Sequence, residues 1–178
     1  MSHAIQVRRW IQVAGCALLV SLGSAQMFPN SWISFGVLHG VAVMLIVLRL
    51  LGTGLPPARV ARAPLAFALV AGLGAVAWLL PHFVRDAFFD ARWTNWVGLV
   101  TRLPVTEDYV PVLPWLGMML AGYLAASLLL VHARAAFTGA VPAGVRPLAA
   151  LGRWSLSFYM LHQPILIGLL MAFHWATS

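Results

Sequence analysis

The sequence of 178 residues contains no lysine and few charged residues of any kind. Charged residues make up 8% of the chain and hydrophobic residues 62%, whereas roughly 25% of residues in soluble domains are charged. So few charges cannot cover the surface of a soluble fold of this length, and lipid must therefore solvate much of it. The missing lysine, together with abundant Ala, Gly, Val and Leu, is typical of a bacterial gene of high GC content. The composition predicts an integral membrane protein.

Cysteine is equally scarce, because Cys16 is the only one in the chain. This excludes an intramolecular disulfide, and we expect no metal site built on cysteine. The six histidines are too dispersed to predict a metal site, and we expect none. The formal net charge of +7 comes from arginines scattered between apolar blocks. Because they form no basic stripe, we expect no nucleic-acid partner.

Long apolar runs make up most of the sequence. Five of them approach the roughly 20 residues that a helix needs to cross a bilayer. The sequence predicts an all-α, polytopic membrane helix bundle in a single domain, residues 1–178, whose main partner is the lipid bilayer. The predicted spans are residues 10–27, 32–51, 64–80, 113–131 and 154–175. Residues 82–112 form the longest polar loop.

The arginines predict the orientation of these helices. Alternate connecting segments hold eight arginines and no acid: Arg8, Arg9, Arg49, Arg59, Arg62, Arg134, Arg146 and Arg153. The other segments hold three arginines and all four acidic residues. Since arginine-rich short loops stay in the cytoplasm, the N-terminus is predicted inside and the C-terminus outside. We expect a multi-pass protein of the bacterial inner membrane.

The polar loop has a pattern of its own. Residues Phe83 to Leu103 mix apolar and charged positions at roughly helical spacing. This pattern is compatible with an amphipathic segment lying in the membrane interface. An ordered loop packed on the helix ends explains it equally well, and the sequence leaves both interpretations open.

Two histidines lie inside predicted spans, where ionisable groups are expensive and often functional. His39 is about seven residues into the second span, or roughly 10 Å below its outer end at 1.5 Å per residue. His162 is about eight residues into the fifth span, next to Gln163 and Pro164. Pro164 cannot donate a backbone hydrogen bond and frees carbonyls near Met160. Each histidine has a structural interpretation, as a neutral side chain bonded to a helix, and a functional one in a substrate pocket.

Two further charges lie near helix ends. Asp108 precedes the fourth span and is placed to orient or deprotonate a histidine, or to bind a substrate. Its structural alternative is a favourable interaction with the dipole of that same helix. Arg153 precedes the fifth span on the predicted cytoplasmic side, where it can meet a phosphate or anchor the helix by snorkelling.

Three stretches together resemble a known family. They are Phe35-Gly-Val-Leu-His39, Asp108-Tyr-Val-Pro-Val-Leu-Pro-Trp-Leu-Gly117 and Leu151-Gly-Arg-Trp-Ser-Leu-Ser-Phe-Tyr-Met-Leu-His-Gln-Pro164. Their order and spacing are similar to those of the bacterial membrane family related to the catalytic domain of heparan-alpha-glucosaminide N-acetyltransferase. That family resembles a branch of the polytopic membrane acyltransferases, and the resemblance runs from about Arg8 to the end of the chain.

The resemblance implies a membrane-bound O- or N-acyltransferase that binds no permanent cofactor. Its co-substrate is expected to be cytosolic acetyl-CoA or another acyl-CoA, and its acceptor a cell-envelope glycan or glycolipid. The matching catalytic positions are His39, Asp108 and His162. The matching positions for acyl-CoA are Arg153 and Gln163.

One departure from the family pattern concerns the start of the chain, which resembles the third helix of the family. The catalytic histidine expected for the family belongs to the part before it. From this we expect a misplaced start codon, a natural short form that is inactive alone, or a chain that works as a homo-oligomer or with a partner membrane subunit. A non-catalytic membrane scaffold or subunit of a larger complex is the alternative function.

Overall fold

The computed structural model describes residues 3–135 and 142–177, and these residues form helices and loops but no strand. The long helices are α1 (His3–Met27), α2 (Val37–Gly54), α4 (Pro64–Phe83), α5 (Val112–His132) and α8 (Ser155–Thr177). Each is long and apolar enough to cross a membrane. The prediction of an all-α membrane protein with five membrane helices is therefore confirmed.

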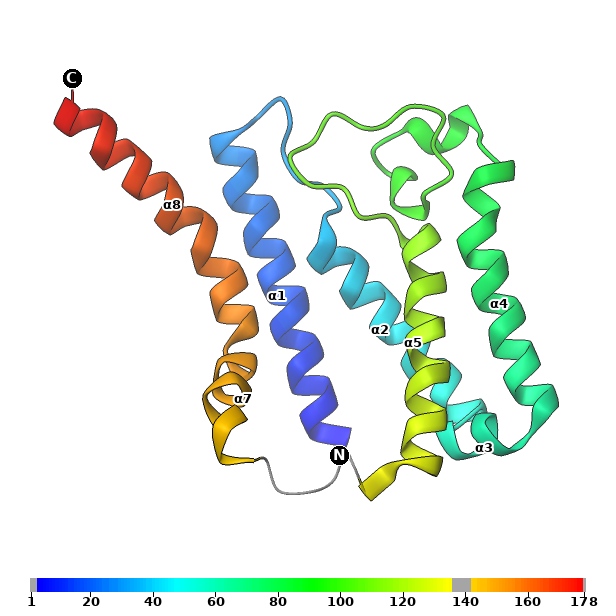
Figure 1. Cartoon of the computed structure of the whole chain (residues 1–178). Helices are drawn as coiled ribbons and strands as arrows, with labels where there is room; N and C mark the ends of the chain where they lie inside the picture. Colours follow the sequence, from blue (N-terminus) through cyan, green and yellow to red (C-terminus); the bar gives the residue numbers. More distant parts are fainter. Residues whose placement is uncertain (1–2, 136–141, 178) are drawn as a thin grey trace. The chain divides into compact units, whose positions relative to one another are not determined.

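Shorter helices connect the long ones. They are α3 (Pro57–Arg62), the 3-10 helices η1 (Ala87–Asp90), η2 (Asn95–Val97) and η3 (Ala143–Val145), and α7 (Arg146–Arg153). The chain divides into two compact units, Met1–Phe137 and Thr138–Ser178, each described here by itself. The first unit contains α1 to α5, and the second contains η3, α7 and α8 (Figure 1).

The first unit packs most closely where α4 and α5 meet. A Cβ atom added at Gly117 would lie 2.7 Å from the carbonyl oxygen of Gly74 and 2.9 Å from the backbone nitrogen of Trp78. The absence of a side chain at Gly117 thus lets the two backbones approach, as small residues commonly do between membrane helices. The nearby core consists of Val60, Ala66, Val70 and Leu120.

Helix α1 is attached to α2 by a hydrogen bond from an indole. The Trp10 Nε1–H donates to the carbonyl oxygen of Ala42 at 2.9 Å. Most of the remaining surface of α1 is apolar and exposed, including Leu18 at 63%. Large exposed apolar side chains are expected where lipid surrounds a helix.

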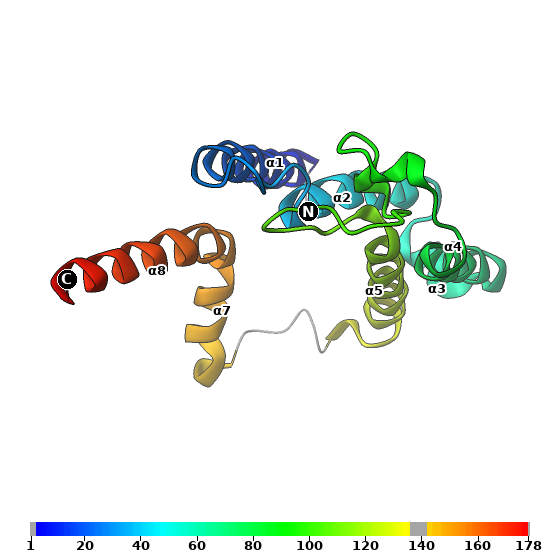
Figure 2. The same ribbon diagram turned by 90° about the horizontal axis from the view of Figure 1, so that it is seen from above.

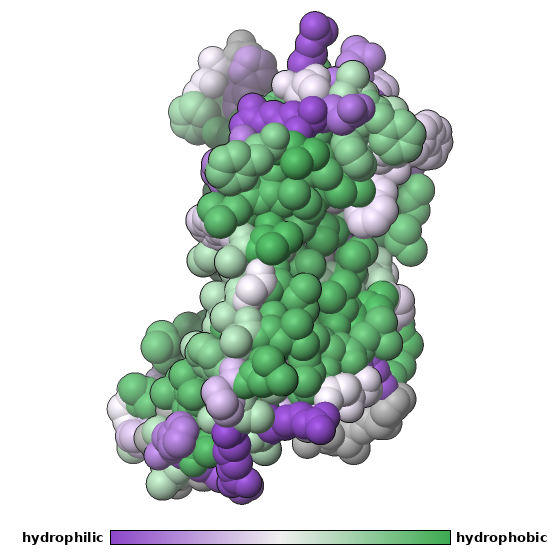
Figure 3. Space-filling view, turned by 90° about the vertical axis from the view of Figure 1, so that its right-hand side faces the viewer, coloured by the Kyte–Doolittle hydropathy of each residue, from purple (hydrophilic) through white to green (hydrophobic). Residues whose placement is uncertain are grey.

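An apolar band covers the side of the first unit on which α4 lies. Figure 3 shows this band between polar residues gathered at its two ends. Leu65, near the start of α4, is 83% exposed. The pattern matches a bilayer core between two aqueous faces.

Helix α2 begins at Val37, and the predicted start at Trp32 is wrong. The chain before Val37 bonds to side chains of α1 instead of to itself. The Ile33 N–H donates to Ser24 Oγ at 3.0 Å, and the Ile33 carbonyl accepts from Ser21 Oγ at 2.7 Å. Because these backbone groups already have partners, the apolar run continues without helix through residues 32–36.

The polar loop between α4 and α5 is ordered. It contains η1 and η2 instead of one continuous amphipathic helix, so the structure selects the second of the two interpretations. The loop lies at the end of the first unit where α2 and α5 begin (Figures 1 and 2). Gly98 ends η2 with φ of 100°, and a Cβ atom there would collide with the carbonyl of Leu113. Glycine at this position lets the loop close onto α5.

Candidate functional site

The carboxylate of Asp108 lies at the N-terminus of α2. Its Oδ2 accepts a hydrogen bond of 2.8 Å from the Val37 N–H. A methyl group at Gly36 would overlap this carboxylate, so glycine leaves the room that Asp108 fills. The structural alternative for Asp108 placed it at the dipole of the fourth span. The fold instead brings the carboxylate to the exposed N–H groups at the start of α2.

His39 lies in the first turn of α2, and its predicted depth of roughly 10 Å below the end of that helix is wrong because α2 begins only at Val37. The Gly36 N–H donates to His39 Nδ1 at 3.3 Å, and His39 Nε2 lies 3.2 Å from Ser21 Oγ. The Ser21 hydroxyl donates its proton to the Ile33 carbonyl and is left to accept. His39 therefore carries its proton on Nε2 and donates it to Ser21, which joins α1 to α2.

Asp108→Ala is expected to lower the stability of the first unit by about 1 kcal/mol, because the first turn of α2 loses its carboxylate partner. Asp108→Asn keeps an acceptor and should cost less. The measurement is the unfolding free energy of the protein in detergent micelles. Asp86→Ala is the matched control, because the Asp86 carboxylate in the same loop accepts a bond from the local Phe88 N–H, two residues away. Equal losses for Asp108→Ala and Asp86→Ala would contradict this role.

In the second unit, His162 lies on α8 and bonds to the backbone of its own helix. Its Nδ1–H donates to the Tyr159 carbonyl at 2.6 Å. Its ring stacks on Phe158, with centroids 6.0 Å apart and an interplanar angle of 10°. Helix α8 continues past Pro164. Pro164 cannot donate a backbone hydrogen bond to the preceding turn of α8. The His162 side chain bonds to a carbonyl next to that turn.

The remaining predicted positions also lie in the second unit. Arg153 is the last residue of α7, and its side chain is exposed. Gln163 is a residue of α8, and its side chain lies outside the part of the chain that the structure describes. The structure thus brings His39 and Asp108 together in the first unit, while Arg153 and His162 lie on consecutive helices of the second.

Some residues that hold the chain before α2 and the polar loop in place carried no clear signal in the sequence. Ser21 and Ser24 lie in an apolar run, and only the fold shows that they bond to the chain before α2. Tyr109 donates to the Asn95 carbonyl at 2.6 Å. Burial, and then the negative charge of Asp90, raise the pKa of Tyr109 to about 12. The phenol therefore stays protonated and keeps this bond at neutral pH.

Asp90 organises the same loop. Its carboxylate accepts from the hydroxyl and the N–H of Thr101 and from the N–H of Arg102. These bonds, led by that from the Thr101 hydroxyl, lower the pKa of Asp90. In the part of the chain that the structure describes, no three His, Cys, Asp or Glu side chains are arranged to hold a metal. The arrangement offers oriented imidazoles and carboxylates, which suit proton transfer and binding.

Comparison with known proteins identifies the family. Neither the curated proteins nor the solved structures give a match to this chain. The family model described as heparan-alpha-glucosaminide N-acetyltransferase, catalytic, matches residues 2–164. This range includes all five positions that the sequence selected. The chain belongs to the heparan-alpha-glucosaminide N-acetyltransferase catalytic-domain family.

Proposed function

We propose that this chain transfers an acetyl or other acyl group from cytosolic acyl-CoA to a cell-envelope glycan or glycolipid in the bacterial inner membrane. Family membership over residues 2–164 and five apolar helices support this function. The single observation that carries the chemistry is the hydrogen bond of His162 to the Tyr159 carbonyl.

This hydrogen bond fixes which nitrogen of His162 can act as a base. A carbonyl oxygen only accepts, so the proton of the neutral ring is on Nδ1 and the lone pair is on Nε2. The hydrogen bond occupies Nδ1 and thus leaves Nε2 as the nitrogen that can accept a proton. The stacked Phe158 ring holds the imidazole plane. An oriented ring with one available lone pair is the form that a general base requires.

The proposed reaction is a direct acyl transfer. The acceptor hydroxyl or amine attacks the thioester carbonyl, forming a C–O or C–N bond, and the C–S bond breaks. His162 Nε2 takes the proton from the acceptor and gives it to the departing CoA thiolate. Acylated acceptor and free CoA leave, and His162 returns to its neutral form.

The other selected residues have supporting roles in this proposal. His39 has both ring nitrogens bonded, and with Asp108 it fixes the start of α2. Both are therefore proposed as positioning residues on the acceptor side. Arg153 is proposed to bind a phosphate of CoA, since a guanidinium matches phosphate oxygens in pairs. Gln163 is proposed to bind the same co-substrate.

The orientation follows from the distribution of arginines. We propose that the N-terminus and the arginine-rich connections, which include α3 and α7, face the cytoplasm. The polar loop between α4 and α5 then faces outward, toward an envelope acceptor. A reporter enzyme fused after Ser178 should be active only on the outer side of the membrane. Activity of that fusion in the cytoplasm would refute the orientation.

The test of the function is transfer itself. The purified full chain, reconstituted in liposomes, should move label from radiolabelled acetyl-CoA to an added glycan or glycolipid. Absence of labelled product across neutral, amino and acidic sugar acceptors would contradict the proposal.

A further inference from the structure

The polar loop holds a pocket that the mechanism above does not use. Its volume is about 240 Å³. Its lining comes from the connection before α2, from the loop around η2 and from the chain before α5, and includes Asn30, Trp32, Ser34, Arg92, Asn95 and Thr106. Pockets for drug-sized ligands have volumes of roughly 300–1,000 Å³, so this pocket fits a smaller unit. All of these residues belong to the first unit.

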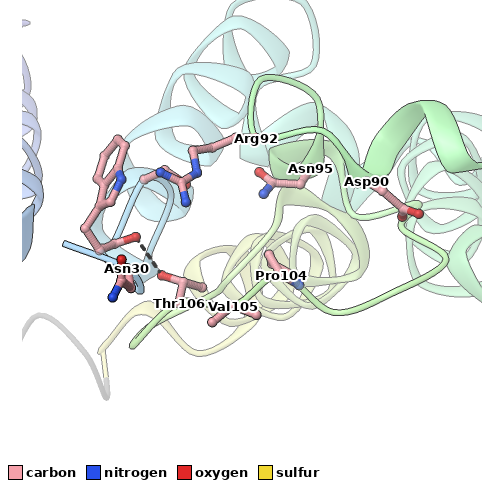
Figure 4. A pocket seen from close by; sticks show the side chains of 9 residues that line it. Asn30, Asp90, Arg92, Asn95, Pro104, Val105 and Thr106 are labelled. Atoms are coloured by element: carbon pink, nitrogen blue, oxygen red, sulfur yellow. Dashed lines mark hydrogen bonds between the residues drawn. The ribbon is translucent and has the colours of Figure 1, made fainter. Parts of the chain in front are cut away.

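The first sign of a ligand is Asn95. Its side chain is only 3% exposed, and its Oδ1 has no hydrogen-bond partner within the described part of the chain. Its own backbone carbonyl is held by the Tyr109 hydroxyl, which fixes the residue in place. The amide end of Asn95 points to the side of the pocket where Arg92 lies (Figure 4). Buried polar atoms without partners are rare in folded proteins and call for an explanation.

The second sign is the charge of Arg92. Its guanidinium carbon lies 4.8 Å from the centroid of the Trp32 ring. A guanidinium stacked on an aromatic face keeps N–H groups at its edge for a ligand. Asp90 also lines the pocket, but its carboxylate is bonded to Thr101 and Arg102. In Figure 4 the Asp90 carboxylate points away from Arg92.

The chemistry of the lining defines the ligand. Hydroxyl and amide groups of Ser34, Thr106 and Asn95 can bind the hydroxyls of a sugar. Arg92 adds a cation without a carboxylate partner among the described residues, and such a cation pairs best with a carboxylate or phosphate. This set distinguishes an anionic sugar from a neutral one.

We propose that this pocket binds one sugar unit carrying a carboxylate or a phosphate, as part of the acceptor glycan or glycolipid. The inference rests on the proposed function, since it names the acceptor class on the outer side. Arg92 binds the anionic group, and Asn95 bonds to a ring hydroxyl.

The test is binding to the detergent-purified full chain, without any acyl-CoA, by titration calorimetry. Glucuronate, glucose 6-phosphate and glucose are the three probes, and the first two separate carboxylate from phosphate. At least one anionic sugar should bind about tenfold or more tightly than glucose, in keeping with a charge-assisted hydrogen bond. Equal affinity for all three sugars, or no binding of any, overturns the proposal.

Arg92→Gln should remove the preference for the anionic sugar. Arg85→Gln is the matched control, because Arg85 lies in the same loop, outside the pocket lining, and bonds to the Pro81 carbonyl. Arg85→Gln should change the affinity by less than about twofold, and Arg92→Lys should restore part of the loss. Equal effects of Arg92→Gln and Arg85→Gln refute the site. The binding test contains no acyl donor, so a failure of acyl transfer does not affect its result. If Arg92→Gln leaves the rate of acyl transfer unchanged, only the pocket is refuted.

Discussion

His162→Gln is expected to slow acyl transfer by about 10²–10⁴-fold, the usual contribution of a general base. Glutamine retains a side-chain N–H that can donate to the Tyr159 carbonyl, but it cannot accept a proton at neutral pH. A purely structural role for the bond between His162 and Tyr159 would survive this change. The measurement is the initial rate of labelled product formation by the reconstituted protein.

A matched control makes the His162 result specific. His174→Gln makes the same chemical change at another histidine of α8 and should keep most of the activity. Equal losses in the His162 and His174 variants would show that His162 is not the base.

Gly117→Ala is expected to destabilise the first unit by about 1–3 kcal/mol, the usual cost of overpacking. The new methyl group would lie 2.7 Å from the Gly74 carbonyl oxygen and 2.9 Å from backbone and Cβ atoms of Trp78. These atoms belong to a helix and cannot move away as the end of a flexible side chain would. Helices α4 and α5 must therefore separate. The measurement is the unfolding midpoint in detergent, followed by tryptophan fluorescence.

The same helix provides the control. Gly122→Ala makes the identical chemical change in α5, but a Cβ atom there meets nothing within 4 Å. It should be neutral or stabilise slightly, since alanine favours a helix over glycine by about 0.5–1 kcal/mol. If both variants had the same unfolding midpoint, close packing at Gly117 would not hold the unit together.

The membrane fold could be predicted because it depends on local composition. An apolar run of sufficient length must form a helix in lipid, where each backbone group needs a partner. The start of α2 could not be predicted in this way. Trp32 and Ile33 continue the apolar run, yet their backbone groups bond to side chains from other segments, namely Ser24, Ser21 and Thr106. Only the folded structure brings these partners together, so the local sequence does not reveal them.

The candidate site likewise contains residues that the sequence could indicate and residues that it could not. The hydrogen bond of His162 joins it to a residue three positions earlier, and the neighbouring proline already drew attention to that turn. Asp108 bonds to Val37, 71 positions away, and nothing near Asp108 in the sequence indicates this partner. Asn95 is one polar residue in a polar loop, and only its burial without a partner for Oδ1 makes it noteworthy.

The central claim is acyl transfer with His162 as the base. The most direct measurement compares the wild type and His162→Gln for transfer of label from acetyl-CoA to neutral, amino and acidic sugar acceptors in liposomes. Labelled acceptor formed by the wild type, and reduced by about 10²–10⁴-fold in the variant, is the predicted result. No labelled acceptor from the wild type, or equal amounts from the two proteins, would contradict it.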